Sequence, residues 1–190
     1  MRIPGIVACI VAAMGAAGGA KACDCVLVHP LDLFDSLEVV FSGVVEDAVL
    51  HPRDPALGWL SGNTEYTFHT VQVWKGPLLK TFKVISGGGC GYSFKRGRHY
   101  IVYAKVFTDD AVGRQNVLST TQCMRPQFVE KALWDRTVLR DPFLVDTAQA
   151  VPRPTQEELV EIANGSDREL AVSAEFALGR QTLKRRDVTR

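Results

Sequence analysis

The chain has 190 residues, of which 46% are hydrophobic and 23% charged, and its formal net charge is +1. This composition is typical of an ordinary globular protein with enough apolar material for one good core. Its near-zero charge creates no field that would draw the chain to nucleic acid or to an anionic membrane, so we expect neither as a partner.

Residues 1–22 have the features of a secretory signal peptide. A basic residue opens the segment, Ile6–Ala17 is apolar and uncharged, and Ala20-Lys21-Ala22 fits an A-x-A cleavage site. The apolar run is too short to remain as a membrane anchor. We therefore predict a secreted or periplasmic protein with no membrane association after cleavage. The alternative is a lipoprotein signal that ends at Cys23, although Lys21 fits that pattern poorly.

Four cysteines remain after this cleavage: Cys23, Cys25, Cys90 and Cys123. An even number in an exported chain predicts disulfide bonds. A bridge between Cys23 and Cys25 would close a strained ring across one residue. Both remaining pairings tie the N-terminal Cys-Asp-Cys to Cys90 and Cys123, and both stay open on these grounds.

Metal binding and catalysis have little support in the sequence. Four histidines lack the spacing of a zinc site and are expected to be solvated or hydrogen-bonded: His29, His51, His69 and His99. A redox C-x-C usually follows a strand, whereas this one precedes every strand signal. The chain has no H-E-x-x-H, G-x-S-x-G or phosphate loop, and a turn or short helix explains Asp32 and Asp35. We predict no enzyme and no cofactor.

Strand signals dominate the first half of the predicted mature chain. Val39–Glu46 alternates so that one face suits a core, and β-branched and aromatic runs follow at Glu65–Trp74, Thr81–Ile85, Arg98–Phe107 and Asn116–Thr121. Thr108–Gln115 is a polar hairpin loop. The long Leu50–Asn63 loop is either functional or a tolerated insertion. Five strands, all antiparallel by connection length, favour a small Greek-key barrel. A β-sandwich is the alternative, but it requires more strands.

Helical patterns follow Cys123. Pro126 is expected to begin a helix that runs to Leu139, with Phe128, Leu133 and Trp134 facing the barrel. Residues 141–154 are rich in proline and are expected to form a linker or an irregular crossing.

Two further helices are predicted at the C-terminal end. Thr155 and Glu158 form a capping box before a helix whose apolar stripe is Leu159, Ile162 and Ala163, and Asn164-Gly165 ends it. Asp167 begins another helix, with Leu170, Ala174 and Leu178 on one face and Gly179 near its end.

Several short motifs resemble those of one known family when they are taken in order. They are Cys23-Asp24-Cys25, Phe41–Val45, Val73–Pro77, Cys90–Phe94, Gly97–Ala104 and Thr121–Cys123. Together they resemble the netrin-like module, and within it the N-terminal domain of the tissue inhibitors of metalloproteinases. The match runs from Cys23 to about Met124.

The resemblance implies a mainly β fold, a five-stranded oligonucleotide/oligosaccharide-binding (OB-fold) barrel. With the C-terminal helices the chain becomes α+β overall. It also implies disulfides Cys23–Cys90 and Cys25–Cys123. We expect an OB-fold domain with a trailing helix at 23–140, a linker at 141–154 and a helical extension at 155–190.

Members of this family inhibit zinc metalloproteases through the first cysteine. The resemblance implies that the amine and carbonyl of Cys23 bind the protease's zinc. The implied contact residues are Cys23, Asp24, Cys25, Val26, Gly89, Cys90 and Gly91, flanked by the Leu50–Asn63 loop. Asp24 departs from the family, where a small uncharged residue enters the protease's specificity pocket. Two hypotheses follow: a metalloprotease inhibitor, or a non-inhibitory module that binds another extracellular or periplasmic protein, matrix or glycan.

Overall fold

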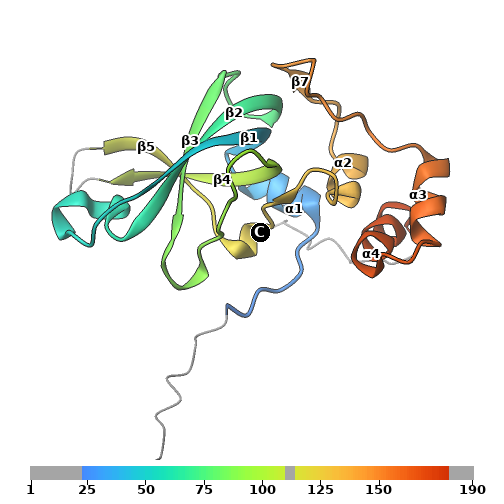
Figure 1. Ribbon diagram of the computed structural model, residues 1–190, viewed down its shortest axis with the longest axis horizontal. Helices are drawn as coiled ribbons and strands as arrows, with labels where there is room; N and C mark the ends of the chain where they lie inside the picture. Colours follow the sequence, from blue (N-terminus) through green and yellow to red (C-terminus); the bar gives the residue numbers. More distant parts are fainter. Residues whose placement is uncertain (1–22, 110–113, 180–190) are drawn as a thin grey trace, which may run out of the picture.

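A closed five-stranded β-barrel forms the centre of the molecule (Figure 1). The computed structural model describes residues 23–109 and 114–179. The barrel strands are β1 (Val39–Leu50), β2 (Asn63–Lys75), β3 (Thr81–Gly87), β4 (His99–Asp109) and β5 (Arg114–Ser119). Their order is β1-β2-β3-β5-β4, and β4 pairs with β1 to close the barrel. The predicted OB-fold barrel is confirmed, whereas the predicted leader lies outside the described residues.

One strand pairing is parallel, so the prediction of a wholly antiparallel barrel is wrong. Val84 and Ile85 of β3 lie beside Leu118 and Ser119 of β5 in the same chain direction. Connection length describes only strands that are neighbours in sequence. Closure of the barrel instead joins β3 to β5, although β4 lies between them in the sequence. This pairing therefore forms only when all five strands are in place.

The strands are longer than predicted at the β4–β5 turn. β4 runs to Asp109 and β5 begins at Arg114, within the stretch predicted as a polar loop. Residues 110–113 of that loop lie outside the described residues. The long loop between β1 and β2 occupies residues 51–62 and contains a short 3₁₀ helix, η1 (Pro55–Leu60).

The barrel interior is filled by aromatic and β-branched side chains. Its buried cluster consists of Val39, Phe41, Val45, Tyr66, Phe68, Val73, Phe82, Val84, Phe94, Tyr100, Val102 and Ala104. Edge-to-face contacts link Phe68 to Phe41 and to Phe94, an arrangement that aromatic quadrupoles favour. Val40, between two interior positions, is also fully buried. Both faces of the first half of β1 are therefore covered, where one was predicted.

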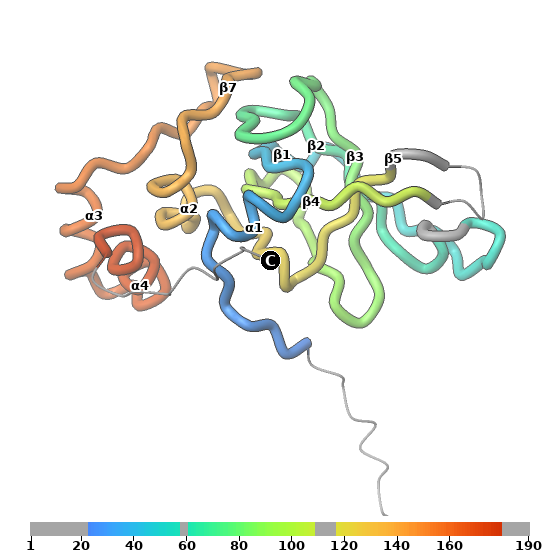
Figure 2. The backbone as a smooth tube through the Cα atoms, turned by 180° about the vertical axis from the view of Figure 1, so that it is seen from behind, coloured from blue at the N-terminus to red at the C-terminus, as the bar shows by residue number. Residues whose placement is uncertain are grey.

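A helical layer covers the outer face beside Val40. Helix α1 (Pro30–Ser36) and helix α2 (Leu133–Val138) pack there, as Figures 1 and 2 show from opposite sides. The second buried cluster lies between them and the barrel: Leu33, Leu37, Val40, Ile101, Tyr103, Ala132 and Leu139.

The predicted helix from Pro126 to Leu139 is wrong over its first half. Gln127–Phe128 forms strand β6, which pairs with Tyr100 and Ile101 of β4. β5 pairs only with the later half of β4, so the early half has an open edge that β6 occupies. Backbone pairing with this edge satisfies polar groups that would otherwise lack partners. The helix begins only at Leu133.

Phe128 faces the barrel as predicted, stacked on Tyr100 at 4.7 Å between ring centroids. Leu133 and Trp134 do not, which corrects their predicted orientation. Leu133 joins a third apolar cluster with Leu159 and Ala174. Trp134 stacks on Phe176 at 4.6 Å. Both side chains pack against the C-terminal helices, because α2 begins later in the sequence than predicted and faces these helices.

The two C-terminal helices form as predicted. Helix α3 (Gln156–Ala163) begins at the Thr155–Glu158 capping box and ends at Asn164. Helix α4 (Arg168–Ala177) is capped by the Asp167 carboxylate. Gly179 follows with φ 71°, the left-handed conformation that glycine favours at helix ends. Their predicted apolar stripes meet in the third cluster: Ile162, Ala163, Leu170 and Leu178 pack against its buried residues.

Residues 141–154 cross over the barrel. Within them Phe143–Leu144 forms strand β7, which pairs with Gln72 and Val73 of β2. The buried Gln72 amide donates to the carbonyl of Val151. Among the described residues, every helix is too short or too polar to cross a bilayer.

Candidate functional site

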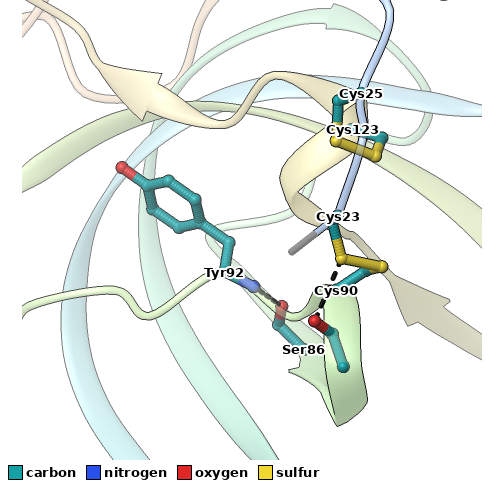
Figure 3. Close-up of a disulfide and its surroundings, with 7 residues drawn as sticks. Cys23, Cys25, Ser86, Cys90, Tyr92 and Cys123 are labelled. Carbon is teal, nitrogen blue, oxygen red and sulfur yellow. Dashed lines mark hydrogen bonds between the residues drawn. A yellow bond between two sulfur atoms is a disulfide. The ribbon is translucent and has the colours of Figure 1, made fainter. Parts of the chain in front are cut away.

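Two disulfides fix the N-terminal segment to the barrel (Figure 3). Cys23 is bonded to Cys90, with their Cα atoms 5.5 Å apart. Cys25 is bonded to Cys123, with a Cα separation of 5.0 Å. This is the pairing that the resemblance implies. Such bonds are typical of proteins in oxidising compartments.

The segment between these bonds exposes alternate residues. Cys23 and Cys25 are partly buried, whereas Asp24 is exposed. Two apolar side chains follow in the open, Val26 at 67% and Leu27 at 47% exposure. Successive side chains of an extended chain point to opposite sides, so the bridges turn the cysteines toward the barrel and leave Asp24 and Val26 to solvent. We call residues 23–27 the N-terminal ridge.

The connector that holds Cys90 is a tight glycine turn after β3. Gly88 has φ 67°, in the region that side chains disfavour. A Cβ on Gly91 would lie 2.4 Å from the Cα of Gly87, so a larger residue cannot replace it without moving the backbone. The hydroxyl of Ser86 accepts from the Tyr92 N–H (Figure 3). The same hydroxyl donates to the carbonyl of Thr120. The partner of Cys23 is thus held at both ends of its turn.

Cys23 also contacts this turn directly. Its Sγ lies 3.0 Å from the carbonyl oxygen of Gly89. A half-cystine has no S–H to donate, so this is a sulfur–oxygen packing contact. Gly89 and Cys90 are exposed, and the predicted contact residues 23–26 and 89–91 therefore meet at one surface.

The 51–62 loop leaves the barrel at the same end as the glycine connector. Asn63, the first residue of β2, pairs with Gly87, the last residue of β3. The loop that precedes Asn63 and the connector that follows Gly87 consequently start from adjacent backbone positions. This supports the predicted flanking place of the loop beside the N-terminal ridge.

Asp32 and Asp35 lie on α1, the short helix that was the simpler explanation for them. Asp32 is in the first turn, where a carboxylate complements the helix dipole. The His29 side chain accepts from the Leu31 N–H and caps this helix. Neither aspartate belongs to the surface formed by residues 23–27 and 89–91.

The histidines differ in their surroundings. His69 hydrogen-bonds Asp146 at 2.9 Å and lies 3.9 Å from Glu46. His51 and His99 are partly exposed, and their Nε2 atoms are buried with no hydrogen-bond partner among the described residues. Within the described ranges, no group of three or more His, Cys, Asp or Glu could hold a metal ion.

His99 makes stability depend on pH. Burial lowers the pKa of its imidazole from the usual 6.5 to about 4, an effect that Glu130 opposes and Arg136 reinforces. Between these values the unfolded chain binds a proton that the folded chain does not. The contribution of the neutral His99 side chain to the stability of the fold is therefore complete above pH 6.5 and is lost as the pH falls toward 4. In His99→Gln, the free energy of unfolding measured by urea denaturation is expected to vary less with pH between 6.5 and 4. If its dependence on pH is the same as in the natural chain, other groups cause that dependence.

A buried charged network was missed by the sequence analysis. Asp135 of α2 is completely buried and accepts hydrogen bonds from Tyr103 at 2.7 Å, Arg125 at 2.9 Å and Gln127 at 2.7 Å. Arg125 also donates to the carbonyl of Val28, just beyond the N-terminal ridge. The sequence carries little signal for it, because Asp135 is followed directly by Arg136 and Thr137 and so resembles the solvent-facing side of a helix.

No protein family model matches this chain. No curated protein matches it at a significant level either.

Proposed function

We propose that this protein is exported to the cell exterior or the periplasm, and inhibits a zinc metallopeptidase by docking Cys23 on the protease's zinc. The observation that carries the proposal is the disulfide between Cys23 and Cys90, beside an exposed segment that begins at Asp24. It rests also on the predicted cleavage after Ala22, which would make Cys23 the first residue. The protein itself needs no cofactor and catalyses no reaction in this role.

The chemistry depends on a free α-amine at Cys23. The amine nitrogen and the carbonyl oxygen of one residue can close a five-membered chelate on a metal. An α-amine has a pKa of about 8, so a useful neutral fraction exists near neutrality. Bound this way, the residue would displace the catalytic water from the open position of a protease zinc. A chelator already fixed to the barrel loses little conformational entropy on docking.

Asp24 determines which proteases can accept the ridge. Its exposed carboxylate would follow Cys23 into the pocket that receives the next side chain. An apolar pocket would strip its hydration at a cost of several kcal/mol, and the catalytic carboxylate of the protease would repel it. We therefore infer a target with a basic pocket. Asp24→Ser should extend inhibition to enzymes with apolar pockets, in a panel that compares both proteins.

The first experiment is intact mass and N-terminal sequencing of the exported protein, followed by assays against a panel of zinc proteases. A mature chain that starts at Cys23, with an unmodified amine and no free thiol, supports the proposal. Acylation of Cys23 would consume both the amine and the sulfur and would exclude chelation.

Adding one alanine before Cys23 is expected to weaken inhibition at least about a hundredfold, roughly 2.7 kcal/mol. The extension converts the α-amine to an amide, which is a poor metal ligand, and inserts bulk at the zinc. The inhibition constant against the most sensitive protease of the panel measures the effect. One alanine added at the C-terminus is the matched control, and it should leave the constant unchanged. Equal constants for both extensions would contradict chelation.

Asp24 also supports a second candidate, a non-inhibitory module that binds another extracellular or periplasmic protein, matrix or glycan. The same carboxylate that limits the accessible proteases is compatible with a ridge that meets a basic partner surface. A correctly processed Cys23 without inhibition of any zinc protease in the panel, for the natural chain and for Asp24→Ser, would favour this second function.

A further inference from the structure

A pocket of about 310 Å³ lies beneath the crossing segment of residues 141–153. Three separate stretches of the chain form its walls: the end of β2, the end of α2 and the crossing segment itself. β7, whose Leu144 lines the pocket, lies at the opposite end of the molecule from the N-terminal segment in Figures 1 and 2. The pocket is thus separate from the proposed inhibitory ridge.

The pocket walls are held in place by polar contacts within the chain. The Gln72 amide nitrogen donates to the Val151 carbonyl, and the Val151 N–H donates back to the amide oxygen of Gln72. The pairing of β7 with β2 fixes the other wall. The cavity is therefore built into the fold and does not depend on one mobile side chain.

The charge of the lining is strongly unequal. Three arginines line the pocket, Arg136, Arg140 and Arg153, against one carboxylate, Asp141, among the described lining residues. The ion pairs of the described residues include none of these four groups. Arg140 is exposed and makes no hydrogen bond with another described residue. The lining of the pocket consequently carries more positive than negative charge.

Arg136 is the most deeply placed of the three. Its terminal nitrogens donate to the carbonyls of Val129 and Pro152, and its buried Nε–H has no acceptor among the described residues. Burial lowers the pKa of this guanidinium, an effect that Glu158 opposes. Carbonyl partners orient the group without neutralising it. Arg136 is partly buried, and although Glu158 is near enough to act on it, the two form no direct ion pair, so the guanidinium favours the binding of an anion.

The rest of the lining is apolar. Trp74, Leu144 and Val151 contribute hydrophobic surface beside the guanidinium groups. The volume is at the lower end of the range for small-molecule sites, which combine apolar walls with a few polar groups. We propose that this pocket binds a small amphipathic monoanion, a carboxylate carried on an apolar body. The carboxylate pairs with the arginines, and the apolar body covers the hydrophobic wall.

The test uses 3-phenylpropionate as the probe on the intact, disulfide-bonded protein, with binding followed by NMR chemical-shift titration. Two matched probes separate the need for the negative charge from the need for the apolar body. The neutral 3-phenylpropionamide keeps the apolar body without the charge, and acetate keeps the charge without the apolar body. We expect saturable shifts at residues 136–153 with 3-phenylpropionate, and at least about tenfold weaker binding of either matched probe.

Arg140→Gln is the variant of choice because Arg140 is exposed and forms no hydrogen bond with another described residue. Loss of a charge-assisted contact is expected to weaken 3-phenylpropionate binding about tenfold. Arg168→Gln, at an exposed arginine on α4, is the matched control and should bind as the natural chain does.

Four results would overturn the proposal. The first is the absence of saturable binding of 3-phenylpropionate. The second is equal binding of acid and amide, which would make the pocket merely apolar. The third is equal loss in Arg140→Gln and Arg168→Gln, which would indicate general surface charge. Binding of heparin alone, with a steep salt dependence, would likewise identify a polyanion surface in place of this site.

Discussion

Asp135→Asn is expected to lower the free energy of unfolding by about 3–5 kcal/mol, the range for removing one partner of a buried ion pair. The side chain has no exposed surface and accepts three hydrogen bonds. Asparagine keeps the shape but leaves the Arg125 charge without a counter-ion. Urea denaturation followed by tryptophan fluorescence measures the change.

The penalty should be graded across the network. Tyr103→Phe removes one hydrogen bond to a charged group and should cost about 1.5–3 kcal/mol. Burial raises the pKa of the Tyr103 phenol well above its usual value, and the negative Asp135 raises it further, so the hydroxyl remains a donor. Asp141→Asn, at an exposed carboxylate, is the control and should change stability by less than about 0.5 kcal/mol.

The double variant Asp135→Leu with Arg125→Met separates charge from shape. Removing both charges should restore part of the stability that Asp135→Leu alone loses, because no buried charge then lacks a partner. A double variant as unstable as the sum of the two single variants would contradict an interaction between the two groups.

This network joins parts of the chain that the sequence analysis assigned to different regions. Arg125 contacts Val28 near the N-terminal ridge and lies 4.8 Å from the Trp134 ring. Trp134 in turn stacks on Phe176 of α4. The C-terminal helices therefore support, through α2, the same wall of the barrel to which the N-terminal segment is tied.

The strands were predictable because their signals are local. Alternation and β-branched residues marked Glu65–Trp74 and Arg98–Phe107, and the structure extends each by only a few residues. The Thr155–Glu158 capping box likewise placed α3 correctly, since it satisfies backbone groups within one turn.

The errors occurred where distant parts of the chain meet. The parallel pairing of β3 with β5 follows from barrel closure, and Gln127–Phe128 becomes a strand because β4 offers an open edge. Neither cause is visible in a short window of sequence. The same limit hid the arginine pocket, since Arg136, Trp74 and Val151 come together only when residues 141–153 cross β2.

Within the candidate site, the cysteines were the predictable part. Their number and the resemblance together gave both bridges, Cys23–Cys90 and Cys25–Cys123. The exposure of Val26 and Leu27 and the Ser86 contacts behind Cys90 were not predictable. These features depend on how residues 23–27, which have no periodic pattern, lie on the surface of the folded barrel.

Replacing either cystine by two serines is expected to cost about 4 kcal/mol of unfolding free energy, and replacing both should unfold the chain. The bridges close loops with sequence separations of 67 and 98. Once one bridge is present, the other still closes a path of about 35 residues, so each removes a comparable amount of unfolded-state entropy. The combined loss approaches the whole stability of a typical domain. Urea denaturation of the three variants measures it.

The two single-bridge variants should lose similar amounts of stability, but only one of them should lose the proposed inhibition. Without the Cys25–Cys123 bond, Cys23 stays fixed to Cys90, and the folded fraction should keep its inhibition constant. Without the Cys23–Cys90 bond, the segment is held only from Cys25 onward, and ordering the free first residues on docking should weaken inhibition about tenfold or more. Equal inhibition by the two folded variants would mean that the position of Cys23 beside the glycine connector is not what the protease recognises.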